Sequence, residues 1–132
     1  MKDRIGMETP TAEQLVTKKC LPCEGGVDAC SLDYSNSQLT HLPHWRMTAD
    51  GKWIRRSIRL KNFLRTLACV NQIGELAETE AHHPDLHITG YRNLAIELTT
   101  HAIGGLSEND FILASKIDRI LATDFPEIKN NE

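Results

Sequence analysis

The dipeptide Asp50-Gly51, which separates two runs that each carry a tryptophan, constrains the fold more than any other feature of the sequence. Asp-Gly favours the backbone angles of a two-residue hairpin turn. In the second run Ile54, Ile58 and Leu60 fall on one face of a strand, and polar or charged residues fall mainly on the other. The sequence therefore predicts an antiparallel strand pair with one face buried.

A long helix is predicted to follow, with Asn62 as its N-cap. Its apolar and small residues recur at steps of three and four, at Phe63, Leu64, Leu67, Val70, Gly74, Ala77 and Ala81. Glycine in mid-helix costs about 1 kcal/mol relative to alanine, so we expect a close packing contact at Gly74. Pro84 disfavours helical geometry in the residue before it, which leaves His82 and His83 at the C-terminal end of the helix.

The remaining elements are read from shorter patterns. A weak helix is expected between residues 31 and 42, with Ser35 or Ser37 as its cap. After an extended piece in "DLHIT" and a turn at Gly90, apolar residues alternate with others in "YRNLAIELTTH", which predicts a strand with His101 in its polar register. A terminal helix opens on the capping-box pattern of Ser107 and Asp110.

The predicted order is therefore α-β-β-α-β-β-α. We expect an α+β fold, a two-layer sandwich in which a four-stranded antiparallel sheet has helices on one face. With 132 residues, 40% of them hydrophobic, the chain is long enough for one domain with one core.

Residues 1 to 30 show neither helical nor strand periodicity, and we expect them to be a flexible extension before a domain at residues 31–132. The extension contains a CxxC pair, Cys20 and Cys23, and Cys30 follows. These cysteines, with His41 or His44, offer an alternative as a structural zinc site, although a single CxxC favours an inert extension. We therefore expect residues 1 to about 28 to be dispensable for catalysis.

Charge and hydropathy narrow the class of protein. A net charge of -3 and a pI near 6.1 argue against direct binding of nucleic acid. The sequence has no run approaching the roughly 18 apolar residues of a membrane span and no apolar centre of a signal peptide near its N-terminus. We expect a cytoplasmic protein.

Three histidines are candidates for proton transfer, because imidazole titrates at about pH 6.5 and can give or take a proton at cellular pH. His82 and His83 are predicted to line one cleft at the helix end, provided that His101 approaches from the neighbouring strand. A metal site that uses the nearby Glu78, Glu80 and Asp85 is an alternative, but "HHP" lacks the i, i+4 spacing that places two imidazoles on one helical face.

The ordered combination of "EAHHPD", "TTH" and "GLSENDF" resembles the pterin-4a-carbinolamine dehydratases, known in animals also as a dimerisation cofactor of a homeodomain transcription factor. The likeness covers about residues 31 to 122. It implies loss of water from a 4a-hydroxytetrahydropterin to give the quinonoid dihydropterin in tetrahydropterin recycling, with no metal or organic cofactor. It also implies a homodimer or homotetramer.

The resemblance also implies roles for individual residues. His82 and His101 are expected to be the acid and base, and His83 to position the pterin as a third member of the catalytic trio. Glu78 and Thr100 are expected to contact the substrate, and Asp110 to orient a histidine or to hold the substrate. Leu86 stands where animal members often carry tryptophan. The alternative to an enzyme is a protein-binding module of the same fold in which the histidines are residual.

Overall fold

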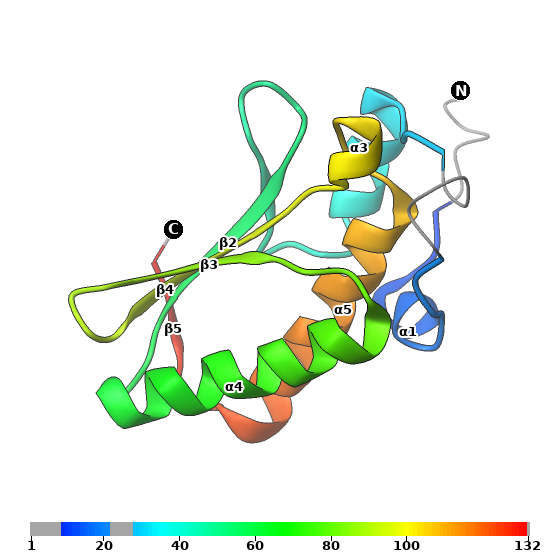
Figure 1. Ribbon diagram of the computed structural model, residues 1–132. Coiled ribbons are helices and arrows are strands. Elements are labelled where there is room, and N and C mark those ends of the chain that lie inside the picture. The colour runs from blue at the N-terminus through cyan, green and yellow to red at the C-terminus, as the bar shows by residue number, and fades with distance from the viewer. Residues whose placement is uncertain (1–8, 22–27, 132) are drawn as a thin grey trace.

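An antiparallel sheet forms one layer of the molecule and two long helices form the other, in the computed structural model that describes residues 9–21 and 28–131 (Figure 1). The strands are β1 (Arg46–Met47), β2 (Ile54–Arg59), β3 (Asp85–Thr89) and β4 (Asn93–Leu98), in the spatial order β1-β2-β4-β3. A fifth strand, β5 (Lys129–Asn130), pairs with β2 beyond the end of β1. The predicted α+β sandwich is confirmed, and β5 is an addition to it.

The core face of the sheet is made by cross-strand pairs. Ile54 lies opposite Leu98 and Ile58 lies opposite Leu94, and all four side chains are fully buried. The alternation read from the sequence is therefore confirmed on β2 and β4. The hairpin is also confirmed, but its loop is longer than a two-residue turn, because the Thr48 N–H bonds the Trp53 carbonyl and residues 49–52 lie between them. Gly51 in this loop has a φ of 72°, which glycine tolerates without strain.

Helices α4 (Phe63–Glu80) and α5 (Glu108–Asp124) cover this face of the sheet (Figure 1). Asn62 caps α4 as predicted, but of the residues in the predicted pattern on α4 only Ala77 is buried. The buried residues are Thr66, Cys69, Ile73, Ala77 and Glu80. These residues have the same three- and four-residue spacing as the predicted apolar stripe and lie beside it on the helix. They are buried because this side of α4 packs on α5 and the sheet.

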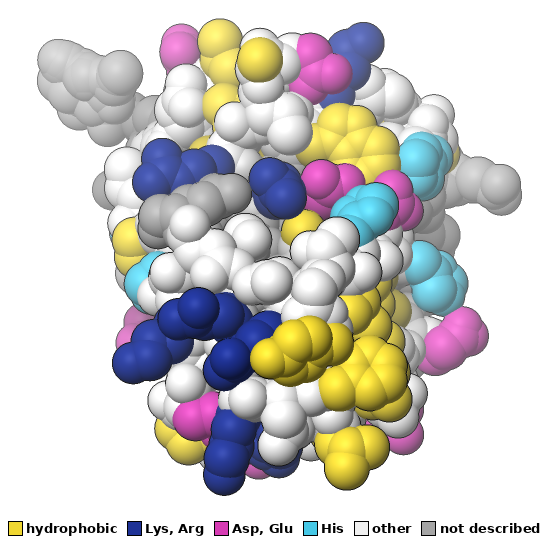
Figure 2. Space-filling view, turned by 90° about the vertical axis from the view of Figure 1, so that its left-hand side faces the viewer, with side chains coloured by type: hydrophobic (Ala, Val, Ile, Leu, Met, Phe, Trp, Pro, Cys, Tyr) yellow, Lys and Arg dark blue, Asp and Glu magenta, His cyan; other side chains and the backbone are white. Residues whose placement is uncertain are grey.

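The apolar stripe of α4 is exposed at its start, at Phe63, Leu64 and Leu67. Figure 2 shows hydrophobic side chains gathered beside a cluster of Lys and Arg on the side of the molecule where α4 begins. The expected close contact at Gly74 is also wrong within this chain, because a Cβ at that position would meet nothing within 4 Å.

Helix α3 (Leu32–Leu39) is present, but its cap differs from the prediction. Ser31, rather than Ser35 or Ser37, accepts a hydrogen bond from the Tyr34 N–H at 3.0 Å. Ser35 is buried within the helix. All three serines can act as an N-cap by their side-chain chemistry. Ser31 is the cap because the helix begins directly after it.

Residues 9–21, which lie within the expected extension, are packed on the domain. Helix α1 (Ala12–Val16) begins with a capping box between Thr11 and Gln14, and its Leu15 is fully buried against α5. Helix α5 is buried around most of its circumference, including Ile112 and Leu113, so it needs a cover on the side away from the sheet. A five-residue helix is too short to show periodicity in the sequence.

Across the parts of the chain that are described, no helix is both long enough and apolar enough to cross a membrane.

Candidate active site

His82 is held at the point where α4 ends. Ala81 adopts a left-handed conformation with a φ of 54°, and the His82 N–H donates to the Ala77 carbonyl at 3.1 Å. This closes the helix and turns the His82 side chain inward, where only 5% of the residue is exposed. Pro84 then prevents the helix from continuing. His82 is thus a buried histidine with a fixed backbone, as the sequence suggested for a helix end.

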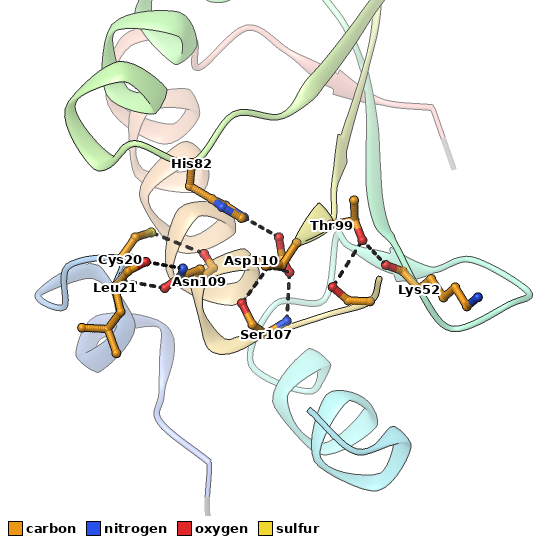
Figure 3. A network of polar contacts seen from close by, with 10 residues as sticks. Cys20, Leu21, Lys52, His82, Thr99, Ser107, Asn109 and Asp110 are labelled. Atoms are coloured by element: carbon orange, nitrogen blue, oxygen red, sulfur yellow. Dashed lines mark hydrogen bonds and ion pairs between the residues drawn. The ribbon is translucent and has the colours of Figure 1, made fainter. Parts of the chain in front are cut away.

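A buried carboxylate, Asp110, faces His82 from the first turn of α5 (Figure 3). His82 Nε2 lies 2.6 Å from Asp110 Oδ1, and Asp110 is fully buried. One proton must lie between two atoms at this separation. When the carboxylate is ionised, Nε2 carries that proton and donates it to Asp110, which fixes the tautomer and the orientation of the His82 ring.

The second oxygen of Asp110 binds two further groups. Oδ2 accepts hydrogen bonds from the Thr100 hydroxyl at 2.8 Å and from the Ser107 N–H at 3.0 Å. The capping box of Ser107 and Asp110 is therefore confirmed. It coexists with the contact to His82, so one carboxylate joins the end of α4, the start of α5 and the chain just after β4.

His101 lies outside the strand in which the sequence placed it. Strand β4 ends at Leu98, and His101 begins a short 3-10 helix, η1 (His101–Ile103), that closes at Gly104 with a φ of 65°. The His101 ring is exposed and meets the Trp53 ring edge-on, with centroids 5.6 Å apart. The residue before His101, Thr100, donates a hydrogen bond to Asp110. The turn that carries His101 is therefore held by the same carboxylate that bonds His82.

His83 differs from its neighbour in environment. Its side chain is 62% exposed and its Nε2 lies 3.0 Å from Oε2 of Glu78, which is also exposed. The pair of adjacent histidines thus divides into one buried and one solvent-facing ring. Glu78 also borders a surface groove of about 730 Å³ that Gly74 and Leu86 line, between α4 and β3.

The alternatives for metal binding are not assembled as the sequence suggested. A set of described residues that could hold an ion is Asp85, His87 and Glu97, whose ligand atoms lie within 4.8 Å of one another. This set includes neither His82 nor His83. Glu80, considered as a ligand, is buried and bonded to Lys116 Nζ at 2.6 Å.

Two of the three cysteines of the possible zinc set, Cys20 and Cys30, can be located, and Cys23 lies outside the described residues. Burial raises the pKa of the Cys20 thiol to about 12 and that of the Cys30 thiol to about 11. Zinc is bound by thiolates, so both thiols would have to lose their protons on binding a metal ion.

Sequence reasoning missed the contacts that the segment after α1 makes with this region (Figure 3). Asn109, next to Asp110, bonds the backbone of Leu21 through both its amide oxygen and its amide nitrogen. Glu80, two residues before His82, accepts a hydrogen bond from the Cys20 N–H. No local pattern in the sequence pairs residues some 60 to 90 positions apart.

The comparisons with known proteins agree on one family. The sequence model of the family described as "Pterin 4 alpha carbinolamine dehydratase" matches residues 29–120. A protein of Nitrosospira multiformis named "Putative pterin-4-alpha-carbinolamine dehydratase" is 44% identical over 110 residues, which cover 83% of this chain and 95% of that protein. The mitochondrial pterin-4-alpha-carbinolamine dehydratase 2 of Arabidopsis thaliana is 42% identical, over 83% of this chain and 60% of that protein.

A solved structure has a similar fold. The transcriptional coactivator/pterin dehydratase from Brucella melitensis superimposes with a TM-score of 0.66 and 27% sequence identity, covering 70% of this chain and 98% of that one.

Proposed function

Because the chain belongs to the pterin 4 alpha carbinolamine dehydratase family, we propose that it converts a 4a-hydroxytetrahydropterin to the quinonoid dihydropterin in tetrahydropterin recycling. The observation that carries this proposal is the buried contact of 2.6 Å between His82 Nε2 and Asp110 Oδ1, close to a second histidine on the turn after Thr100. A carboxylate that fixes the tautomer of a histidine is a typical device of acid and base catalysis.

The reaction requires two proton transfers. The bond between C4a and its hydroxyl oxygen breaks, and that hydroxyl leaves as water after it takes up a proton. N5 of the pterin loses its proton, and the electron pair of that bond forms the double bond between N5 and C4a. Two imidazoles in opposite protonation states supply both transfers, and no electrons leave the system.

We assign the two transfers to His82 and His101. Asp110 orients His82, and its bond to Thr100 restrains the turn that carries His101. His83, paired with Glu78 at the surface, is assigned to binding the pterin. Glu78 is exposed and keeps its expected role beside the substrate, whereas Thr100 and Asp110 are fully buried and are assigned to holding the two histidines instead.

A protein-binding function is the second candidate, since the similar protein from Brucella melitensis is described as a transcriptional coactivator as well as a pterin dehydratase. Such a module has no need of a histidine held by a buried carboxylate. We therefore favour the enzyme, with a pterin as its small-molecule partner.

The test of the proposed function is turnover of 4a-hydroxytetrahydropterin by catalytic amounts of the protein. Dehydration changes the ultraviolet absorbance of the pterin, which allows initial rates to be measured above the spontaneous reaction. We expect many turnovers per protein molecule. A rate equal to the spontaneous one, at protein concentrations that bind the pterin, would identify a binding module instead.

Chelation is expected to leave the activity unchanged, because the proposed proton transfers use side chains alone. The measurement is the initial rate before and after exhaustive dialysis against a chelator. Zinc bound near Cys20 would not alter this expectation. Activity that disappears on chelation and returns with an added metal ion would contradict the assignment to His82 and His101.

Replacement of His83 with alanine is expected to act mainly on KM. A positioning contact made equally in the ground state and the transition state changes binding without changing kcat. Steady-state kinetics of His83→Ala would show a raised KM with kcat within about threefold of the parent value. A fall in kcat by the factor of about 10² typical of a lost acid or base would move His83 into the proton transfer.

We also propose a homo-oligomer, a dimer or a tetramer. The exposed side chains of Phe63, Leu64 and Leu67 on α4 support this, because they form an apolar surface unusual for a helix that faces water. Light scattering on the purified protein gives the mass directly. A monomer at micromolar concentration would refute it.

A further inference from the structure

Lys18–Leu21 crosses the gap between the two helix ends that bring His82 and Asp110 together (Figure 3). We propose that this segment is a positioning strap of the active site, and that Asn109 and Glu80 are its anchors. The strap holds the end of α4 against the start of α5, so that His82 Nε2 stays in contact with Asp110 Oδ1. The kinetic part of this inference rests on the proposed dehydratase function.

The first anchor is Asn109, which is 1% exposed and lies next to Asp110 in the first turn of α5. Its Oδ1 accepts from the Leu21 N–H at 2.9 Å, and its Nδ2 donates to the Leu21 carbonyl at 2.8 Å. A side-chain amide that bonds both groups of one backbone residue fixes the strap in register. The Cys20 thiol adds a contact of 3.6 Å to the Asn109 carbonyl.

The second anchor is Glu80, which lies at the last residue of α4 and two residues before His82. Its Oε1 accepts from the Cys20 N–H at 2.9 Å, and its Oε2 pairs with Lys116 Nζ of α5 at 2.6 Å. Burial opposes ionisation of Glu80, but the hydrogen bond from the Cys20 N–H and the bond and charge of Lys116 outweigh it and hold its pKa below the ordinary value. Glu80 is therefore an ionised carboxylate that ties the strap and both helices together.

The placement of the two anchors distinguishes a strap from ordinary packing. Helix α1 already supplies the apolar contact through Leu15, on the body of α5. The polar contacts of Cys20 and Leu21 go instead to Glu80, two residues before His82, and to Asn109, the residue before Asp110, and so flank the contact of 2.6 Å. Shifts below 1 Å in such a contact are enough to lower catalysis, so its geometry requires support from both sides.

The test uses the imidazole proton shared by His82 and Asp110, which proton NMR detects independently of activity. A strong hydrogen bond shifts this proton far downfield and slows its exchange with water, and loss of the signal in His82→Ala assigns it. In Asn109→Ala we expect exchange to be at least about tenfold faster, and kcat to fall about tenfold with KM little changed.

Two anchor variants and two controls make the test specific. Glu80→Ala should repeat the effect of Asn109→Ala, whereas Glu80→Gln, which still accepts from the Cys20 N–H, should recover most of it. Lys18→Ala removes the exposed pair of Lys18 with Glu108 and should change neither exchange nor kcat. Leu15→Ala should lower the midpoint of urea unfolding and leave the imidazole proton unchanged.

The strap would be overturned if Asn109→Ala and Glu80→Ala lost stability, as Leu15→Ala is expected to, while proton exchange and kcat stayed unchanged. A different result would separate the two proposals. If the parent protein does not dehydrate the pterin, but the imidazole proton exchanges faster in both anchor variants, the proposed function is refuted and the strap is supported.

Discussion

Replacing His82 and His101 together with alanine is expected to lower kcat by at least about 10²-fold, because each general acid or base typically contributes 10²- to 10⁴-fold. The two residues are assigned to different protons, so each single variant should lose activity and the double variant should lose more. The substrate also dehydrates spontaneously, so the spontaneous rate sets the lowest rate that can be observed in any variant. Initial rates of the parent, the two single variants and the double variant measure it.

The burial of the two rings provides the control for this prediction. His82 is buried and bonded to Asp110, so His82→Ala should also lower the free energy of unfolding. His101 is exposed, and His101→Ala should leave stability nearly unchanged. A loss of kcat in both variants, with a loss of stability in only one, separates chemistry from folding. A double variant that keeps more than about half the parent kcat would contradict the assignment.

Asp110→Asn is expected to lower kcat by about 10²-fold or more and the free energy of unfolding by about 1–3 kcal/mol. The amide oxygen can serve the two donors, Ser107 N–H and Thr100 hydroxyl, that Oδ2 now accepts. The amide nitrogen then faces His82 Nε2, which must become an acceptor. The ring is thereby forced into the other tautomer, which is the wrong one for the proposed proton transfer.

Asp118→Asn is a matched control for this variant, because Asp118 is also a carboxylate on α5 and accepts bonds from Trp45 and Arg56. We expect it to lose stability without losing kcat. The measurements are urea denaturation, initial rates and the nitrogen chemical shifts of the histidine rings. Asp110→Asn that loses stability with an unchanged kcat would reduce Asp110 to a capping residue of α5.

The parts of the fold that were predicted correctly have local causes. The turn at Gly51, the cap at Asn62, the alternation of Leu94, Ile96 and Leu98 and the capping box at Ser107 are each visible within a few residues. Local chemistry and tertiary packing agree at these positions. Together they were sufficient to give the order of the elements and the class of the fold.

The predictions were wrong where packing between segments distant in the sequence determines which residues are buried. The buried stripe of α4 could not be chosen from periodicity, because Cys69 and Ile73 lie on a stripe with the same spacing as Leu67 and Gly74. Helix α1 was missed because its stability depends on burying Leu15 against α5 rather than on its own sequence.

The candidate site was predicted in its residues but not in its arrangement. The sequence identified His82, His83, His101 and Asp110, yet it placed His101 on a strand and treated the two adjacent histidines as two sides of one cleft. The structure instead divides them by burial, with His82 bonded to Asp110 and His83 facing solvent beside Glu78. Contacts between the ends of α4 and α5 decide this, and they are not local in sequence.

Chemical rescue tests the proposed histidine mechanism most directly. His101 is exposed, so replacing it with glycine leaves an accessible space that free imidazole can enter. The initial rate of dehydration by His101→Gly is measured as imidazole is added, with the parent protein and the protein-free reaction followed at the same concentrations. We predict a low rate without imidazole and a saturable increase that neither reference shows. A variant that is already as active as the parent, or one whose rate rises no more than the protein-free reaction, would contradict proton transfer by His101.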